Sequence, residues 1–313
     1  RLVAKILILF AIFIGSIFVV NRIDNAGVQD VSVEMEQAEL PIVYVRYHDQ
    51  FINTLHGYTG KVDTTYFRDT ITPMDYGQTI ELWSDQGSRE YNAYQYELRS
   101  QYQGDLIENG DVTELTQADG YDKVSITFRT KLEELQEYVL VLKAMNGEDV
   151  GARYYTRVVV ENDFHTDKLL EFVGKFNAAI FDKAEAEKTI SKSIEPNEDG
   201  NNEYLSEVDI HSSFDTITFA DLNPTQLTKP IASIKEIDDS YAIIQLKYMI
   251  SATENKIVEN FYVTEDYRVR YVDESNVYLL DYKRTQDALF TPDNVNITAN
   301  NFKIGVTNDD AFQ

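Results

Sequence analysis

The chain has 313 residues, 43% of them hydrophobic, no Cys and a formal net charge of −25 at pH 7. It is long enough for two domains, and its apolar fraction is too high for a disordered acidic tail. The negative charge repels phosphate backbones and excludes nucleic-acid binding as a main role. Without Cys, the sequence offers no thiol nucleophile, disulfide framework, thiolate metal site or Cys-linked lipid.

The first 23 residues differ from the rest in charge. They hold Arg1, Lys5 and Arg22 and no acidic residue, whereas residues 24–313 hold 25 basic and 53 acidic residues, a net charge of −28. The short basic end and the long acidic part are therefore expected to lie in different environments.

An uncharged apolar run occupies residues 6–20, and with the residues before it the run approaches the about 20 residues that span a bilayer. We predict a transmembrane anchor over residues 1–23 that contacts the membrane through residues 2–20, with a cytoplasmic N-terminus and extracytoplasmic C-terminal domains. A cleaved signal peptide and a buried core helix are the alternatives. Cleavage is disfavoured because Ala26 has Asp24 two positions earlier, a poor match to the cleavage rule.

Residues 24–39 are polar and acidic, and we expect them to form a stalk. From residue 40 onward, short apolar runs recur at roughly ten-residue spacing with turn residues between them, a pattern typical of a β-sandwich. We predict this domain over residues 40–162. Its expected strands are 42–47, 51–55, 79–83, 93–99, 124–128, 138–144 and 154–160.

Two of these runs resemble strands of fibronectin type III and other immunoglobulin-like sandwiches. Residues 135–147 resemble the strand before the last hairpin, with a Leu, Tyr138 three positions later and alternating apolar residues. Residues 93–99 are similar to the central strand, and Trp83 stands where such domains keep a core aromatic residue. The resemblance implies that the ring of Tyr138 packs between the sheets and that its hydroxyl bonds the backbone at the corner.

The resemblance covers residues 68–161, and the usual Pro of the family's turn is replaced by Glu133 or Glu134. Because this fold hosts many functions, it implies an interaction or spacer module only by analogy.

An α+β domain is predicted over residues 163–313. Apolar residues at helical spacing predict a helix over 164–181 with Thr166 as its N-cap, and a second helix runs from Lys183 to about residue 194. Five strands then form an antiparallel meander, with the two helices available to cover one face. They are expected at 233–237, 241–250, 256–263, 267–272 and 277–282. Since no terminal signal precedes Gln313, the sequence leaves open whether this domain is truncated.

The whole chain also resembles N-terminally anchored extracytoplasmic proteins of anaerobic Firmicutes. Residues 151–157 match the stretch that closes their first module, and residues 278–284 match one in their second. This resemblance implies a location at the bacterial cell envelope and carries no assigned activity.

The sequence designates no catalytic, cofactor-binding or metal-ligating residue. His48, His56, His165 and His211 are isolated, without a metal-ligand spacing. Residues 211–215 gather the residue types of a nucleophilic triad, but no nucleophile-elbow motif surrounds either Ser.

An acidic loop at residues 195–203 resembles a calcium loop through Asn197, Asp199 and Gly200. It lacks the final bidentate Glu, because Ser206 would hold that position. We therefore expect a solvated turn. Residues 296–298 match a glycosylation acceptor, which carries little weight in a bacterial protein.

Tyrosine is unusually frequent, with 21 copies against a single Trp. Rows of exposed aromatic rings bind sugars, but Tyr94, Tyr96 and Leu98 share one strand face, so we expect these rings in the core.

Together these features favour a non-enzymatic, membrane-anchored binding or scaffolding protein of the bacterial cell envelope, with an envelope protein or a glycan as its partner. One alternative is an envelope enzyme acting on cell-wall glycan through carboxylates that folding brings together. Another is a single-pass regulator of a membrane signalling partner.

Overall fold

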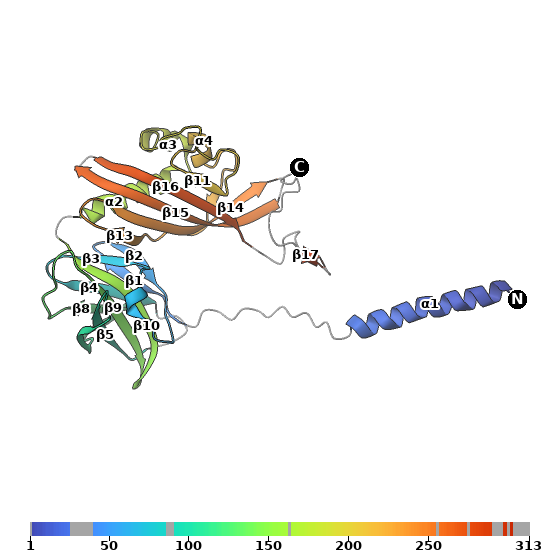
Figure 1. Cartoon of the computed structure of the whole chain (residues 1–313), viewed down its shortest axis with the longest axis horizontal. Helices are drawn as coiled ribbons and strands as arrows, with labels where there is room; N and C mark the ends of the chain where they lie inside the picture. The colour runs from blue at the N-terminus through green and yellow to red at the C-terminus, as the bar shows by residue number, and fades with distance from the viewer. Residues whose placement is uncertain are drawn as a thin grey trace. The chain divides into compact units, whose positions relative to one another are not determined.

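The computed structural model describes residues 2–25, 40–85, 91–161, 164–254, 257–273, 276–289, 297–298 and 301–302. Two compact units are present, Arg1–Glu39 and Leu40–Gln313. The described structure is mainly β, as predicted, with three large sheets, a small two-stranded sheet and four α-helices (Figure 1).

The first unit contains helix α1 (Leu2–Asn25). Its described apolar side chains, among them Leu9, Phe10 and Phe13, are exposed. Across the described part of the chain, no helix combines the length and apolar character needed to cross a membrane. The helix includes the first two residues of the expected stalk, and residues 26–39 lie outside the described residues.

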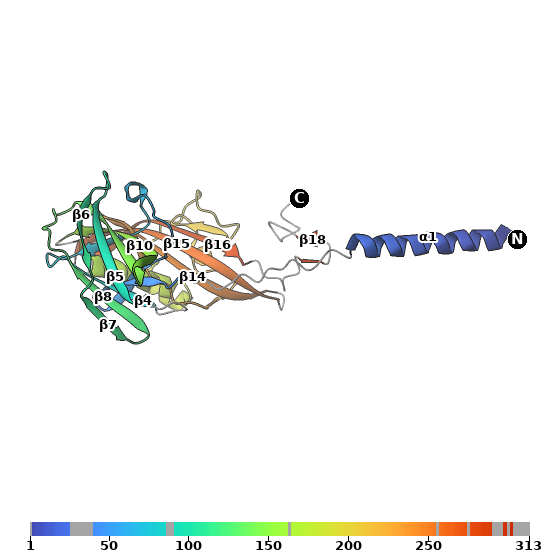
Figure 2. The same cartoon turned by 90° about the horizontal axis from the view of Figure 1, so that it is seen from below.

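Two five-stranded sheets form a β-sandwich in the second unit (Figures 1 and 2). The first sheet has the order β2-β1-β4-β8-β7 and the second β3-β10-β9-β5-β6, with β3 parallel to β10. The first sheet consists of β1 (Val43–Tyr47), β2 (Gln50–Leu55), β4 (Thr79–Asp85), β7 (Glu114–Ala118) and β8 (Tyr121–Thr127). The second consists of β3 (Ile71–Met74), β5 (Ala93–Ser100), β6 (Leu106–Asp111), β9 (Glu137–Asn146) and β10 (Asp149–Val160).

Every second residue along the strands points into the core of the sandwich. On β5, Tyr94, Tyr96 and Leu98 are buried, which confirms the predicted face. On β4, Ile80 and Leu82 point inward, whereas Trp83 is only half-buried. The expectation that Trp83 is a core aromatic residue is therefore wrong, because it alternates with the inward residues of its own strand.

Tyr138 on β9 takes the place expected of it. Its ring is buried, and its hydroxyl accepts a hydrogen bond from the Glu133 N–H at 3.0 Å. The bond ties the start of β9 to the turn before it, where Leu135 has a positive φ of 61°.

A third, six-stranded sheet forms the C-terminal part. Its order is β11-β16-β15-β14-β12, and β13 also pairs with β14, so that β13 to β16 form the predicted antiparallel meander. The strands are β11 (Glu207–Asp209), β12 (Thr225–Gln226), β13 (Ser233–Ile237), β14 (Ala242–Glu254), β15 (Ile257–Asp273) and β16 (Asn276–Ala288). The small sheet pairs β17 (Ile297–Thr298) with β18 (Asn301–Phe302).

Strand β15 replaces two predicted strands. Thr264, Glu265 and Asp266 were expected to form a turn, but they continue the ladder with β14 and β16. Glu265 is fully buried, and its carboxylate accepts hydrogen bonds from Asn177 at 2.7 Å and from the hydroxyl of Tyr282 at 2.7 Å. The polar residue thus belongs to an internal network.

Three short helices accompany this sheet, together with a 3-10 turn, η1 (Thr64–Tyr66), in the sandwich. Helix α2 (Thr166–Ala179) packs Phe176 against the rings of Tyr267 and Tyr282. Its N-cap is His165, not Thr166 as predicted, since Thr166 is already helical. Helix α3 (Lys183–Thr189) ends before the predicted residue 194, and α4 (Phe214–Ile217) was not predicted.

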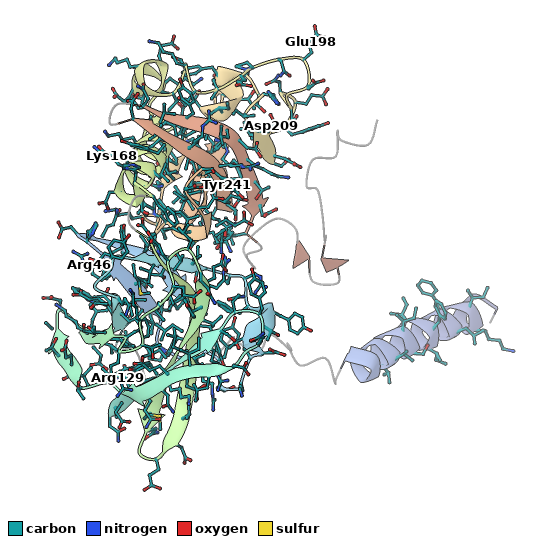
Figure 3. The ribbon with its side chains drawn as sticks, turned by 60° about the vertical axis from the view of Figure 1, so that its left-hand side comes forward. Arg46, Arg129, Lys168, Glu198, Asp209 and Tyr241 are labelled. Atoms are coloured by element: carbon teal, nitrogen blue, oxygen red, sulfur yellow. The ribbon has the colours of Figure 1, made fainter. Side chains whose placement is uncertain are left out.

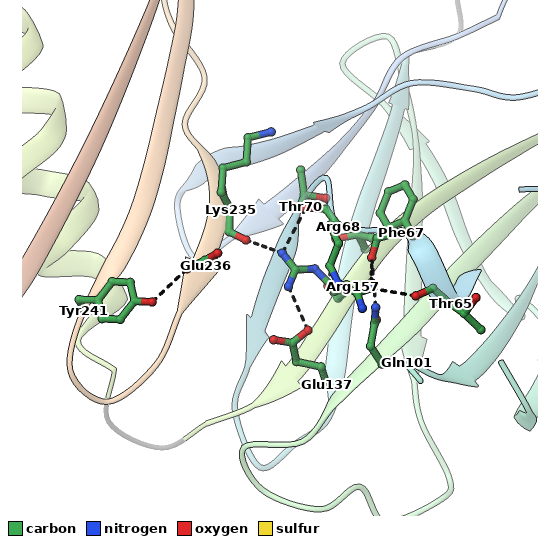
Figure 4. A network of polar contacts seen from close by, with 11 residues as sticks. Thr65, Phe67, Arg68, Thr70, Gln101, Glu137, Arg157, Lys235, Glu236 and Tyr241 are labelled. Atoms are coloured by element: carbon green, nitrogen blue, oxygen red, sulfur yellow. Dashed lines mark hydrogen bonds and ion pairs between the residues drawn. The ribbon is translucent and has the colours of Figure 1, made fainter. Parts of the chain in front are cut away.

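Buried hydrogen bonds join the sandwich to the C-terminal part. Asn53 on β2 is fully buried, donates its backbone N–H to the Ala232 carbonyl at 2.8 Å and accepts from the Ile234 N–H at 2.8 Å. The Arg157 guanidinium on β10 donates to the Glu137 carboxylate at 3.0 Å and to the Lys235 carbonyl (Figure 4). These bonds hold β13 against the sandwich.

Candidate functional site

The residues next to His211 serve local structure. Ser213 is the N-cap of α4 and accepts a hydrogen bond from the Thr216 N–H, and Asp215 forms an ion pair with Lys183 at 2.5 Å. Ser212 is fully buried. The structure therefore brings these residues together as a cap and an ion pair, without a triad geometry.

The acidic loop at 195–203 is held by its own side chains. The Asn197 side-chain oxygen accepts from the Asp199 N–H at 2.8 Å, and its amide nitrogen lies 2.9 Å from the His211 ring. A Cβ on Gly200 would lie 2.0 Å from the His211 carbonyl oxygen, so the loop packs closely there because residue 200 is Gly. Among the described residues, no group of three or more His, Asp or Glu is arranged to hold a metal ion.

A cleft of about 550 Å³ lies where the sandwich meets the start of α2, and we call it the junction cleft. Its size falls within the ~300–1,000 Å³ of small-molecule sites. Residues from β1, β3, β4 and the segment around the start of α2 line it. They are 45–48, 72–75, 79–81, 161 and 164–168.

Charged groups of both signs line the junction cleft. Arg46 comes from β1 and Lys168 from α2 (Figure 3), and the carboxylates are those of Asp75, Glu81, Glu161 and Asp167. The His48 Nδ1 atom lies 2.9 Å from the Asp167 carboxylate and so links the turn after β1 to the first turn of α2. The cleft thus offers hydrogen-bond donors, acceptors and an imidazole to a polar ligand.

The pKa of the Tyr47 hydroxyl reflects its burial and the charges that line the cleft. Burial raises its pKa to about 12; the nearby Thr166 side chain opposes the rise, and the carboxylates of Glu161, Asp167 and Asp75 add to it. The hydroxyl therefore stays protonated at neutral pH.

His165 connects the cleft to the third sheet. Its ring stacks on Tyr271 of β15 with 3.5 Å between ring centroids and 18° between planes. Its backbone is left-handed, with φ of 50°, so that the chain turns sharply into α2. Two of the four histidines that looked isolated, His48 and His165, therefore line one cleft, whereas His56 is exposed elsewhere.

Four aromatic rings cluster on the outer face of the first sheet, and we call them the aromatic face. They are Tyr44, Phe51, Trp83 and Tyr121, on β1, β2, β4 and β8. Trp83 lies 5.1 Å from Phe51 and 5.6 Å from Tyr121 between ring centroids, and all four side chains are half-buried. The Arg46 guanidinium, which lines the junction cleft, lies 5.4 Å from the Trp83 ring and connects the two features.

Sequence reasoning missed the junction cleft because its residues come from separate segments. No motif joins His48, Asp75 and Asp167, and only the fold places them together. The aromatic face did carry a signal, since Thr79, Glu81 and Trp83 alternate with buried residues along one strand.

Comparisons with known proteins add no identity. No protein-family model matches the chain, and no curated protein sequence matches it.

Proposed function

We propose that the protein is a non-enzymatic binding or scaffolding protein of the bacterial cell envelope and that the junction cleft is its binding site. One observation carries the proposal: the cleft has walls from both the sandwich and the C-terminal part. Buried bonds of Asn53 and Arg157 hold these parts together, so the site is preformed and a ligand pays little ordering entropy.

The proposed fold family is immunoglobulin-like. The parallel pairing of β3 with β10 and the neighbouring positions of β5, β9 and β10 support this assignment. The Tyr138 hydroxyl bond to the preceding turn supports it too. A sandwich of this kind suits a binding or spacer role by analogy alone.

The proposed location is extracytoplasmic, with residues 1–23 as a membrane anchor. The support comes from the sequence: residues 6–20 are uncharged, and the first 23 residues are basic whereas the rest is acidic. Alkaline carbonate extraction of membranes from expressing cells tests the anchor. The full chain is expected in the membrane pellet, and its release into the supernatant would contradict the proposal.

Co-sedimentation with purified cell-wall sacculi tests the binding function. The full chain in detergent is expected to pellet with sacculi in a saturable manner and to leave the supernatant free of soluble wall fragments. Failure to pellet would contradict binding to this partner. Release of soluble sugar or peptide fragments would instead support the enzyme alternative, which the four carboxylates of the cleft favour.

A further inference from the structure

The aromatic face occupies a position where a solvated sheet normally carries polar side chains. The inward residues of the same strands, such as Val45 and Leu82, already fill the sandwich core. The four outward rings are therefore additional to the core. A contiguous aromatic cluster of this kind, outside the core and half-exposed, is a feature of interaction surfaces.

The ladder registers assemble the aromatic face from neighbouring strands. Tyr44 is directly opposite Trp83 in the pair β1–β4, and Trp83 is directly opposite Lys123 in the pair β4–β8. The Lys123 Nζ atom lies 3.9 Å from the Trp83 ring centroid, and Arg46 lies over the rings of Phe51 and Trp83. Rings and hydrogen-bond donors thus alternate across one sheet surface.

The charge of the chain favours some classes of partner for this surface over others. Its two cations already have acidic neighbours, because Arg46 lies 3.8 Å from Asp49 and Lys123 lies 3.0 Å from Asp119. The chain as a whole is strongly acidic and repels anionic polymers and anionic lipid surfaces. A neutral ligand meets no such repulsion.

Neutral carbohydrate has the complementary chemistry. The apolar C–H faces of a pyranose stack on aromatic rings, and its hydroxyls bond charged and phenolic groups at the rim. Burial and the neighbouring Tyr121 and Asp85 raise the pKa of Tyr44, so its hydroxyl remains a donor at neutral pH. Arg46 extends the surface into the junction cleft.

We infer that the aromatic face binds a neutral glycan chain by stacking sugar rings on Tyr44, Phe51, Trp83 and Tyr121. The inference names a partner class for the proposed binding function and rests on it. It uses a surface beside the cleft, so variants of the two surfaces can fail separately.

The single Trp of the chain is Trp83, so tryptophan fluorescence reports on this surface directly. The full chain, in a detergent without a sugar headgroup, is titrated with gluco-, manno-, xylo- and chito-oligosaccharides. At least one neutral series is expected to change the emission in a saturable manner, with polygalacturonate leaving it unchanged. An emission that no neutral oligosaccharide changes would overturn the inference.

Two tyrosine variants distinguish stacking from folding. Tyr121→Leu keeps apolar packing but removes a ring, and it is expected to weaken glycan binding about tenfold. Tyr278→Leu removes a Tyr from the third sheet that also lies near a cation, Arg270 at 5.8 Å, and should leave binding unchanged. Circular dichroism confirms that both variants are folded.

Equal glycan affinity of both variants and the wild type would overturn the inference. So would a Tyr121→Leu effect confined to self-association or vesicle binding. If junction-cleft variants lose sacculus binding while their fluorescence titration with oligosaccharides is unchanged, the loss concerns the cleft alone.

Discussion

Replacing Arg284 with Met is expected to lower the free energy of unfolding by about 3–5 kcal/mol, because the change leaves a buried carboxylate without its cation. Arg284 is fully buried on β16, directly opposite Glu265 on β15. Its guanidinium donates to the Ile217 carbonyl at 2.6 Å and to the Thr216 carbonyl at 3.1 Å, and it lies 3.8 Å from the Phe219 ring centroid. Chemical denaturation monitored by circular dichroism measures the change.

The loss of stability caused by Arg284→Met is also expected to depend on pH. Burial raises the pKa of Glu265, whereas Arg284 is the largest influence that lowers it, so the variant raises it further. The pKa of a Glu carboxyl in the unfolded chain is about 4.3. When the pKa in the folded state lies above this value, the free energy of unfolding falls as the pH rises from the unfolded pKa to the folded pKa. The variant should therefore be closer to the wild type at acidic pH than at pH 8.

Two further variants test the cause of the loss. Arg268→Met removes an exposed Arg over the Tyr241 ring and is expected to cost under about 1 kcal/mol. Glu265→Gln combined with Arg284→Met should recover part of the stability, because no buried charge remains. A loss in Arg284→Met as small as that in Arg268→Met would refute the role given to this pair.

Replacing Asn53 with Ala is expected to lower the free energy of unfolding by about 3–5 kcal/mol, because each buried group left unpaired costs about 1–3 kcal/mol. The Asn53 side chain donates to the Ile71 carbonyl at 2.8 Å and accepts from the Ile234 N–H at 2.8 Å. Its φ of 50° is left-handed, which Ala tolerates less well than Asn. Differential scanning calorimetry is expected to show one transition in the wild type and separate transitions in the variant.

The backbone and side-chain contributions of Asn53 can be separated. Asn53→Gly relieves the left-handed strain and should recover about 1 kcal/mol, leaving the loss of the hydrogen bonds. Asn223→Ala places Ala at another left-handed position, φ of 47°, with an exposed side chain, and should cost only about 1–2 kcal/mol. If Asn53→Ala were no less stable than Asn223→Ala, the buried junction would not hold the two parts together.

Local periodicity was sufficient for much of the fold. The alternation in residues 93–99 predicted β5 and its buried face, and β13 was predicted with the bounds that it has. Strand β15 was predicted as two strands because burial of Glu265 depends on Arg284, a partner supplied by the next strand. Polar residues carry no local sign of such a partner.

The site required more information than local pattern contains. The junction cleft joins His48 to Asp167 across 119 positions of sequence, and no spacing rule predicts that contact. The error at Trp83 had a different origin. Its alternation with Ile80 and Leu82 placed it outside the core, and the family resemblance overrode that signal.

The most direct test of the junction cleft as binding site is a charge exchange that keeps the net charge. Asp167→Lys with Lys168→Asp exchanges two cleft residues. Glu171→Lys with Lys175→Glu exchanges an exposed ion pair, 2.6 Å apart, farther along the same helix. Co-sedimentation with sacculi is then measured for both. The cleft exchange is predicted to weaken binding about tenfold, while the control exchange binds as the wild type does. Equal binding by the two variants would contradict the assignment of the junction cleft.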